Sequence, residues 1–209
     1  MKRSKHFLIG LVVLLAGCSS TSTISTWKAD NAQIKRYEKI LVIGIMADTN
    51  RDLRQHMEKA LVEDLRFKGL NAISAFDEYG PQAFKRMTEE QVNEQIRKKG
   101  YDGVITISLL NKSKEKYYVP GSLYYTPFGF EYGYFWGYYS GIYDRVYTPG
   151  YYETANNYLW ESNLYDLSNG KLIYSVQSRS FDPSDAEALG QDYGRTIVRS
   201  LIKNGILVK

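Results

Sequence analysis

Lys39-Ile-Leu-Val-Ile-Gly-Ile-Met46 is a continuous apolar run, and it sets the class of fold that the rest of the chain must satisfy. A run without polar alternation is typical of a strand that is covered on both faces, as the strands of parallel sheets are. Asp52 to Lys68 then places apolar side chains at helical spacing and ends at Gly69, which predicts an amphipathic helix. A buried strand that leads into such a helix is the first half of a β-α-β unit.

Two further strands and a helix are predicted in the first half of the chain. Leu70 to Phe76 has the composition of a short strand, and Tyr101 to Leu110 that of a longer one. Between them, Thr88-Glu-Glu-Gln91 is a capping box that opens a short helix ending at Gly100. The first half therefore has the order β-α-β-α-β, which is the pattern of a parallel sheet with covering helices.

The second half of the chain adds two strands and a helix. Tyr151 to Leu167 and Lys171 to Phe181 predict two long strands joined by a turn. Ser184-Asp-Ala-Glu187 is a second capping box, and its helix places four apolar residues on one face, namely Leu189, Tyr193, Ile197 and Leu201. Ile206 to Val208 is a candidate for a short terminal strand. The predicted fold class is α/β, a single domain with a mixed sheet and covering helices.

A tyrosine- and glycine-rich insertion from 117 to 158 separates the two halves and holds 13 of the protein's 19 tyrosines. An extended backbone would give its centre one wholly aromatic face, whereas a helix would align its glycines in a ridge; the composition favours an extended or irregular backbone. The candidate binding surface consists of aromatic residues at its centre: Phe128, Phe130, Tyr132, Tyr134, Trp136, Tyr138 and Tyr139. Such residues can form a buried hairpin, an exposed interaction site or a membrane contact. The many tyrosine hydroxyls favour the exposed site.

The N-terminus has the layout of an export signal. Basic residues within 1–5 precede an apolar run that is too short to span a bilayer, and Leu15-Ala-Gly-Cys18 ends this run with the only cysteine of the chain. These four residues resemble the lipobox of bacterial lipoproteins, whose cysteine is acylated, with palmitate among the acyl groups, and becomes the first residue. The resemblance implies lipid attachment at Cys18. Ser19, in the place of an acidic residue, implies delivery to the outer membrane, and the lack of an acidic run just after Cys18 favours its periplasmic side.

The predicted organisation has three parts. A lipoprotein signal peptide covers 1–17, a lipidated Ser/Thr-rich tether covers 18–36, and an α/β domain that contains the aromatic insertion covers 37–209. The tether is predicted because seven of the eight residues from Ser19 to Thr26 are Ser or Thr, a composition typical of flexible linkers.

The composition excludes several classes of function. Removal of the signal takes three of the 27 Lys and Arg and leaves 24 of them against 23 Asp and Glu, so the mature chain is close to neutral. Because the chain lacks a basic stripe, nucleic acid is not an expected ligand. Acylation of Cys18 leaves no thiol, which excludes disulfides and metal sites with cysteine ligands. We expect no cofactor and no bound metal.

The side chains that catalysis needs are sparse. His56 is the only histidine of the mature chain, and its place beside the apolar stripe of the first helix favours a structural or surface role. Asp48 follows the first strand, where open α/β sheets bind ligands, but a helix cap formed by Asp48 or Asn50 explains it more simply. Glu161 has no second carboxylate with which to cleave a glycosidic bond. We therefore predict that the chain has no catalytic residues and is not an enzyme.

Short motifs are spread over nearly the whole mature chain: Ser25-Thr-Trp27, Lys39 to Gly44, Arg54 with Glu58, Tyr118-Val-Pro-Gly121, Glu161 to Asp166, Gly170 to Ser175, and Phe181-Asp-Pro183. Together they resemble a widespread family of uncharacterised bacterial outer-membrane lipoproteins. The order of strands and helices is also similar, more loosely, to that of periplasmic α/β lipoproteins such as CsgG, LpoB and the N-terminal domain of TolB. This second resemblance implies roles in binding and assembly and supplies no catalytic residue.

Two functions follow from these observations. The first is a non-enzymatic outer-membrane lipoprotein that binds another component of the cell envelope, a protein or peptidoglycan, through its aromatic surface. The alternative is a subunit of an oligomeric envelope pore or of a secretion or assembly apparatus, in which the aromatic segment enters or lines a membrane. A multimer on gentle detergent extraction would favour the alternative, and a monomer that captures one partner would favour the first.

Overall fold

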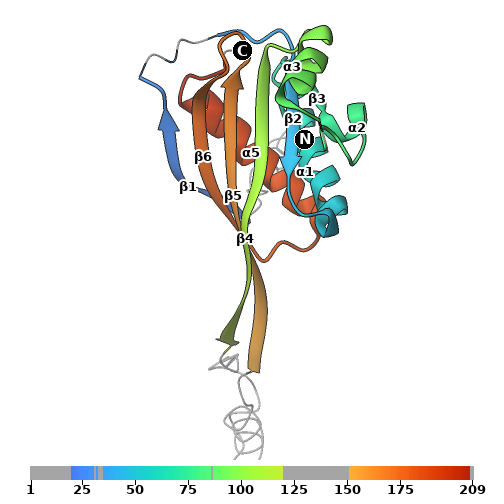
Figure 1. Cartoon of the computed structure of the whole chain (residues 1–209). Coiled ribbons are helices and arrows are strands. Elements are labelled where there is room, and N and C mark those ends of the chain that lie inside the picture. Colours follow the sequence, from blue (N-terminus) through green and yellow to red (C-terminus); the bar gives the residue numbers. More distant parts are fainter. Residues whose placement is uncertain (1–19, 31, 33–34, 86, 120–150, 208–209) are drawn as a thin grey trace, which may run out of the picture.

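Six strands form one mixed sheet in the order β1-β6-β5-β4-β2-β3, which confirms the predicted fold class (Figure 1). The computed structural model describes residues 20–30, 32, 35–85, 87–119 and 151–207. The strands are β1 (Thr21–Lys28), β2 (Ile40–Ile45), β3 (Ala72–Ser74), β4 (Gly103–Val119), β5 (Tyr151–Asp166) and β6 (Lys171–Phe181). β2 pairs in parallel with β3 and with β4, and the other pairs are antiparallel. The β-α-β-α-β half thus supplies the parallel strands, and the antiparallel pairs involve β5 and β6 of the second half together with β1 from the N-terminal segment.

Helices cover both faces of β2, as its unbroken apolar sequence predicts. The described helices are α1 (Arg51–Phe67), α2 (Ala75–Tyr79), α3 (Glu89–Lys98) and α5 (Ala186–Lys203), with a 3₁₀ turn, η1 (Asp48–Asn50), before α1. Ile40 and Val42 belong to the main core, which α1 and α5 close on one face. Leu41 points to the other face, where it packs with Ala75 of α2 and Ile96 of α3. β2 is therefore the strand around which the domain is built.

The capping sequences predicted the start of α3 correctly and the cap of α5 one residue too early. Thr88 and Gln91 form the predicted capping box at the start of α3, with hydrogen bonds of 3.3 and 3.0 Å between side chain and backbone. The capping box predicted at Ser184 is wrong, because Asp185 caps α5 instead, its Oδ1 accepting the N–H of Ala188 at 2.8 Å. The carboxylate is the better acceptor for an N-terminal N–H group, since the helix dipole favours negative charge there.

Two strand predictions in short apolar runs need correction. β3 is only three residues long, because Ser74 accepts a hydrogen bond from the N–H of Asp77 and so starts α2 within the segment predicted as a strand. At the C-terminus, Ile206 and Leu207 are buried in the main core, but the chain there is a turn and, up to residue 207, no terminal strand forms. In both places the burial was predicted correctly and the backbone was not.

The Ser/Thr-rich segment is a strand and not a flexible tether, so order begins well before Tyr37. β1 is an edge strand that pairs antiparallel with β6 from Thr21 to Lys28, with an irregularity at Ile24. Only Thr21 is buried, and the other residues of β1 are exposed. An exposed edge strand has the same polar composition as a linker, and for this reason composition could not distinguish the two.

β4 and β5 continue beyond the sheet as a two-stranded ribbon, here called the arm, formed by residues 112–119 and 151–158 (Figure 1). β6 ends at Phe181, which pairs with Asn157, so from Asn156 outward β5 pairs with β4 alone. β4 is longer than the predicted strand, and an irregularity between Leu109 and Asn111 marks the place where it leaves the sheet. The predicted insertion over 117–158 thus begins and ends within strands of the arm.

Candidate functional site

The predicted sites lie outside the described residues, and only the neighbouring parts of the fold are described. Cys18, the predicted point of lipid attachment, lies outside the described residues. So do all seven aromatic candidates, Phe128, Phe130, Tyr132, Tyr134, Trp136, Tyr138 and Tyr139. Both remain predictions, but the structure fixes the two parts of the fold from which they extend, the first residues of β1 and the arm.

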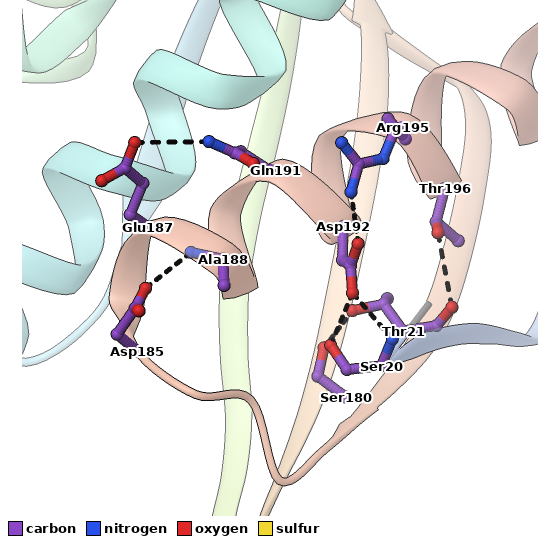
Figure 2. A network of polar contacts seen from close by, with 10 residues as sticks. All are labelled: Ser20, Thr21, Ser180, Asp185, Glu187, Ala188, Gln191, Asp192, Arg195 and Thr196. Carbon is purple, nitrogen blue, oxygen red and sulfur yellow. Dashed lines mark hydrogen bonds and ion pairs between the residues drawn. The ribbon is translucent and has the colours of Figure 1, made fainter. Parts of the chain in front are cut away.

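A polar cluster, here called the N-terminal clamp, holds the start of β1 on α5 (Figure 2). The backbone N–H and the hydroxyl of Ser20 both donate to Asp192 Oδ2, at 2.7 and 2.9 Å. Arg195 donates to the other oxygen of the same carboxylate. One residue further along, the carbonyl oxygen of Thr21 accepts a hydrogen bond of 3.4 Å from Thr196 Oγ1. The chain is thus fixed to the domain only two residues after Cys18.

Asp192 is the charged centre of this clamp. Burial alone would raise the pKa of its carboxyl group, but hydrogen bonds from Ser20 and the charge of Arg195 outweigh burial and hold the pKa below its usual range. Because the folded-state pKa is lower than the unfolded one, ionised Asp192 stabilises the folded protein. That stabilisation is present above the unfolded pKa, about 4, and is lost as the pH falls through the folded pKa.

Replacing Asp192 by asparagine is therefore expected to lower the free energy of unfolding by about 1–2 kcal/mol at pH 7, since charge-assisted hydrogen bonds are weakened. Urea unfolding at pH 7 and below pH 4 checks this, because the difference between wild type and variant should shrink in acid. Asp52→Asn is the matched control, as the Asp52 side chain is 82% exposed. An equal loss in both variants, or a loss that persists in acid, would contradict the assigned role of Asp192.

One row of paired residues connects the clamp with the base of the arm. Thr21 pairs with Ser180, Ser180 with Tyr158, and Tyr158 with Lys112, across β1, β6, β5 and β4. Paired residues point to the same face of a sheet, so all four lie on the face that α5 covers. Side-chain contacts bear this out, with a hydroxyl pair of 2.7 Å between Thr21 and Ser180 and Lys112 Nζ 5.1 Å from the Tyr158 ring centroid. The clamp and the base of the arm therefore lie at the same height along the strands of the sheet.

Aromatic packing makes this row rigid. The Tyr158 ring stacks on Trp160 with the centroids 5.7 Å apart, and Trp160 in turn packs on Tyr193 of α5 at 5.6 Å. Trp160 is fully buried, and its Nε1 donates to Ser180 Oγ at 3.2 Å. A buried indole with its N–H satisfied contributes a large apolar area without the cost of an unpaired donor. The base of the arm is thus part of the domain core.

The two faces of the arm carry opposite charges. Strand alternation places Lys112, Lys114 and Lys116 on the face that continues from Trp160, here called the lysine face. Glu115 and Glu153 lie on the opposite face, where Tyr117 Oη donates to Glu153 Oε2 at 2.6 Å. This hydrogen bond raises the pKa of Tyr117 to about 12. The alternating lysines are visible in the sequence. Their common face was not predicted, because the predicted strand ended at Leu110 and did not include them.

Exposed aromatic side chains line both faces of the arm near its outer end. Tyr118 and Tyr152 pair on the lysine face with their ring centroids 5.4 Å apart. Tyr117 lies on the opposite face, 6.4 Å from Phe181. Tyr152 is 73% exposed, which is far more than the core tyrosines. Part of the tyrosine excess that the sequence shows therefore lies on an accessible ribbon.

The three residues considered for catalysis lie apart and have structural partners. Asn50 takes the predicted N-cap position of α1, without a side-chain cap hydrogen bond. Asp48 is exposed and paired with Lys85 at 2.7 Å, and this partner lowers its pKa. The His56 side chain is 36% exposed on α1, with Asp52 Oδ1 3.6 Å from its Nε2. Glu161 accepts hydrogen bonds of 3.1 and 3.2 Å from Asn163 and Gln177. Within the described ranges no hydrogen bond joins two of these three residues, and no cluster of potential metal ligands occurs.

A buried carboxylate lies at the carboxyl ends of the parallel strands, in the pair Arg54 with Glu58 that the family resemblance marked without a role. Glu58 of α1 is fully buried and accepts four hydrogen bonds of 2.7 Å, from the N–H of Gly44, Arg54 Nε, Ser74 Oγ and the N–H of Phe76. Each carboxylate oxygen accepts two of them, so the group is satisfied within the protein. Glu58 thus joins β2, β3 and α2 to α1, as a structural centre and not a binding site.

A shallow groove between α1 and α5 is the other notable surface feature. It encloses about 520 Å³ and is lined by apolar residues together with basic ones, among them Phe67, Val198, Ile202, Lys68 and Arg199. Phe67 is 82% exposed there. The groove lies on the helical layer, away from the arm, and so offers a contrasting position for tests of the arm.

None of the helices in the described part of the chain is both long and apolar enough to cross a membrane.

Comparisons with known proteins concern the fold alone. No model of a known protein family matches the chain, and no curated protein matches it. The PelC dodecamer from Paraburkholderia phytofirmans is 12% identical, covering 90% of this chain and 99% of that chain, with a TM-score of 0.46. Lipoprotein GNA1162 from Neisseria meningitidis is 14% identical over 79% of this chain and 98% of its own, with a TM-score of 0.40. Likenesses of this degree carry no conclusion about function.

Proposed function

We propose that this chain is a non-enzymatic, lipid-anchored protein of the outer membrane that faces the periplasm. We propose further that it binds another component of the cell envelope through the arm and the aromatic segment that joins the two strands of the arm in the sequence. The observation that carries the proposal is the N-terminal clamp, which fixes Ser20 to Asp192 at the level of the base of the arm.

Chain length turns this clamp into a constraint on orientation. Cys18 precedes Ser20 by two residues, which span at most about 7 Å. An acyl anchor on Cys18 would therefore hold the base of the arm close to the bilayer, whereas a free tether of some 18 residues would leave the domain unoriented. The turn between β5 and β6 lies at the opposite end of the sheet (Figure 1). The proposed lipoprotein thus presents a defined end to the membrane.

Photocrosslinking in intact cells tests the arm as the binding element. A photoreactive amino acid in place of the exposed Tyr151 is expected to give one dominant adduct, with a defined protein or with peptidoglycan. The same substitution at Phe67, which is also exposed but lies in the α1–α5 groove, should give little or none. A dominant adduct at Phe67 together with none at Tyr151 would move the binding site to the groove and contradict the proposal.

The proposed absence of enzymatic chemistry predicts that three substitutions leave the cellular function intact. His56→Ala, Asp48→Asn and Glu161→Gln are each expected to destabilise the fold only slightly, because the side chains are exposed or half-buried. Complementation of a deletion strain, with protein abundance measured in parallel, checks this. Loss of function in a variant that stays folded and abundant would point to a hydrolase instead.

An oligomeric envelope pore or assembly apparatus is the second candidate function, and the arm is the observation that favours it. Beyond Phe181, the outer edges of the arm have no neighbouring strand among the described residues. Such edges are templates for pairing with another copy of the chain. Extraction in mild detergent followed by native mass measurement separates the two functions, since this alternative requires a defined multimer and the first does not.

A further inference from the structure

We propose that the lysine face of the arm binds the anionic headgroups of the membrane that holds the lipid anchor. This inference rests on the proposed lipid anchoring and adds a second contact, made by named side chains, between the domain and the bilayer. It makes the lysine face of the arm a membrane-surface element and leaves the opposite face available to a partner.

The charge of the lysine face is not neutralised within the described residues. None of the three lysines forms an ion pair there, and the ammonium group of Lys112 lies over the face of the Tyr158 ring. By contrast, other exposed lysines such as Lys59 and Lys98 each have a glutamate one helical turn away. Three unpaired ammonium groups in one row form a surface that attracts anions.

The row Thr21–Ser180–Tyr158–Lys112 places this charge beside the proposed anchor. Neighbouring strands lie about 4.8 Å apart, so the Cα atoms of Thr21 and Lys112 are separated by about 14 Å. Lys114 and Lys116 follow at steps of about 7 Å along the same face. Ser20, two residues after Cys18, is held on α5, which packs on the face of the sheet that continues into the lysine face. A bilayer that holds Cys18 is therefore within reach of all three lysines.

Tyrosines complete the chemistry of an interfacial surface. Tyr118 and Tyr152 lie on the lysine face, are 54% and 73% exposed, and pack against each other. Tyrosine combines an apolar ring with a polar hydroxyl, a pairing suited to the headgroup region of a bilayer. Glu115 and Glu153 lie on the opposite face. An anionic surface would repel these two carboxylates. The arm thus has one face suited to anionic lipid and one that is not.

Amine footprinting of the acylated protein in vesicles tests the inference. The purified lipoprotein is reconstituted into vesicles of phosphatidylcholine alone or with phosphatidylglycerol, treated with an amine-reactive acetylating reagent, and analysed by mass spectrometry. Each lysine near an anionic surface strengthens the attraction about fivefold, and we expect modification of Lys112, Lys114 and Lys116 to fall by about this factor with phosphatidylglycerol. The protection should vanish in about 1 M salt, where screening is nearly complete. Lys59 and Lys98 are internal controls whose modification should not change.

Flotation of the same samples separates this inference from the proposed anchoring. Flotation with both kinds of vesicle and equal modification of the arm lysines in both would overturn the inference and leave the anchor intact. Flotation with anionic vesicles alone, with the arm lysines protected, would support the inference and contradict the anchor. No flotation with either would contradict both. If added inorganic phosphate protected the arm lysines in neutral vesicles as well as phosphatidylglycerol does, that result would assign the lysine face to a soluble anion. Protection that occurs only in whole envelopes would assign it to an acidic protein.

Discussion

Replacing Glu58 by alanine is expected to lower the free energy of unfolding by about 3–5 kcal/mol, a large part of the stability of a typical domain. The substitution leaves four donors without an acceptor: the N–H groups of Gly44 and Phe76, Ser74 Oγ and Arg54 Nε. The guanidinium would become an uncompensated charge, since the Arg54 side chain is only 13% exposed. Urea unfolding of the purified protein, followed by circular dichroism, measures the loss.

A matched substitution on the same helix provides the control for this result. Glu63 lies on α1 with a side chain that is 61% exposed and 4.0 Å from Lys59, so Glu63→Ala should cost less than about 1 kcal/mol. Gly44→Ala should also destabilise the cluster, because a Cβ there would lie 2.7 Å from Arg54 Cγ. If Glu58→Ala were as mild as Glu63→Ala, the parallel half of the sheet would not depend on this carboxylate.

The second large effect is expected from Cys18→Ala. Without the thiol no lipid can be attached, and the variant should either leave the membrane fraction or accumulate as an uncleaved precursor. A single acyl chain already gives measurable binding and several give stable anchoring, so their complete loss is expected to lower membrane association by orders of magnitude. Cell fractionation with a carbonate wash, followed by immunoblotting, measures the distribution.

Ser19→Ala is the control for the anchor, because it alters the neighbouring residue and keeps the thiol. It should be processed and fractionate as the wild type does. A processed form of Cys18→Ala that stays with the membranes after the carbonate wash would show that another contact is the main tether.

The features that could be predicted from the sequence are those that a local pattern of residues determines. The apolar run at 40–45 predicted a doubly covered strand because burial on both faces leaves no room for polar residues. Helical spacing predicted α1 and the buried face of α5, including Tyr193 and Leu201. These features depend on residues close in the sequence, and the structure confirmed them.

What could not be predicted depends on partners that are distant in the sequence. β1 looks like a linker until β6 is placed beside it, since an exposed edge strand needs few apolar residues. The Glu58 centre joins residues 14 to 18 positions away, and no motif marks that spacing. The clamp between Ser20 and Asp192 spans 172 positions. The lysine face required knowing that β4 continues past Leu110 in register with β5.

The orientation of the domain at the membrane is the central claim, and depth-dependent fluorescence quenching tests it most directly. The acylated protein has no other thiol, so Tyr152→Cys and Asn169→Cys each give one labelling site, at opposite ends of β5. With the lipoprotein in vesicles that carry a headgroup-attached quencher, a fluorophore at 152 should be strongly quenched and one at 169 should not. Equal quenching at both positions, or stronger quenching at 169, would contradict a domain held with its arm at the bilayer.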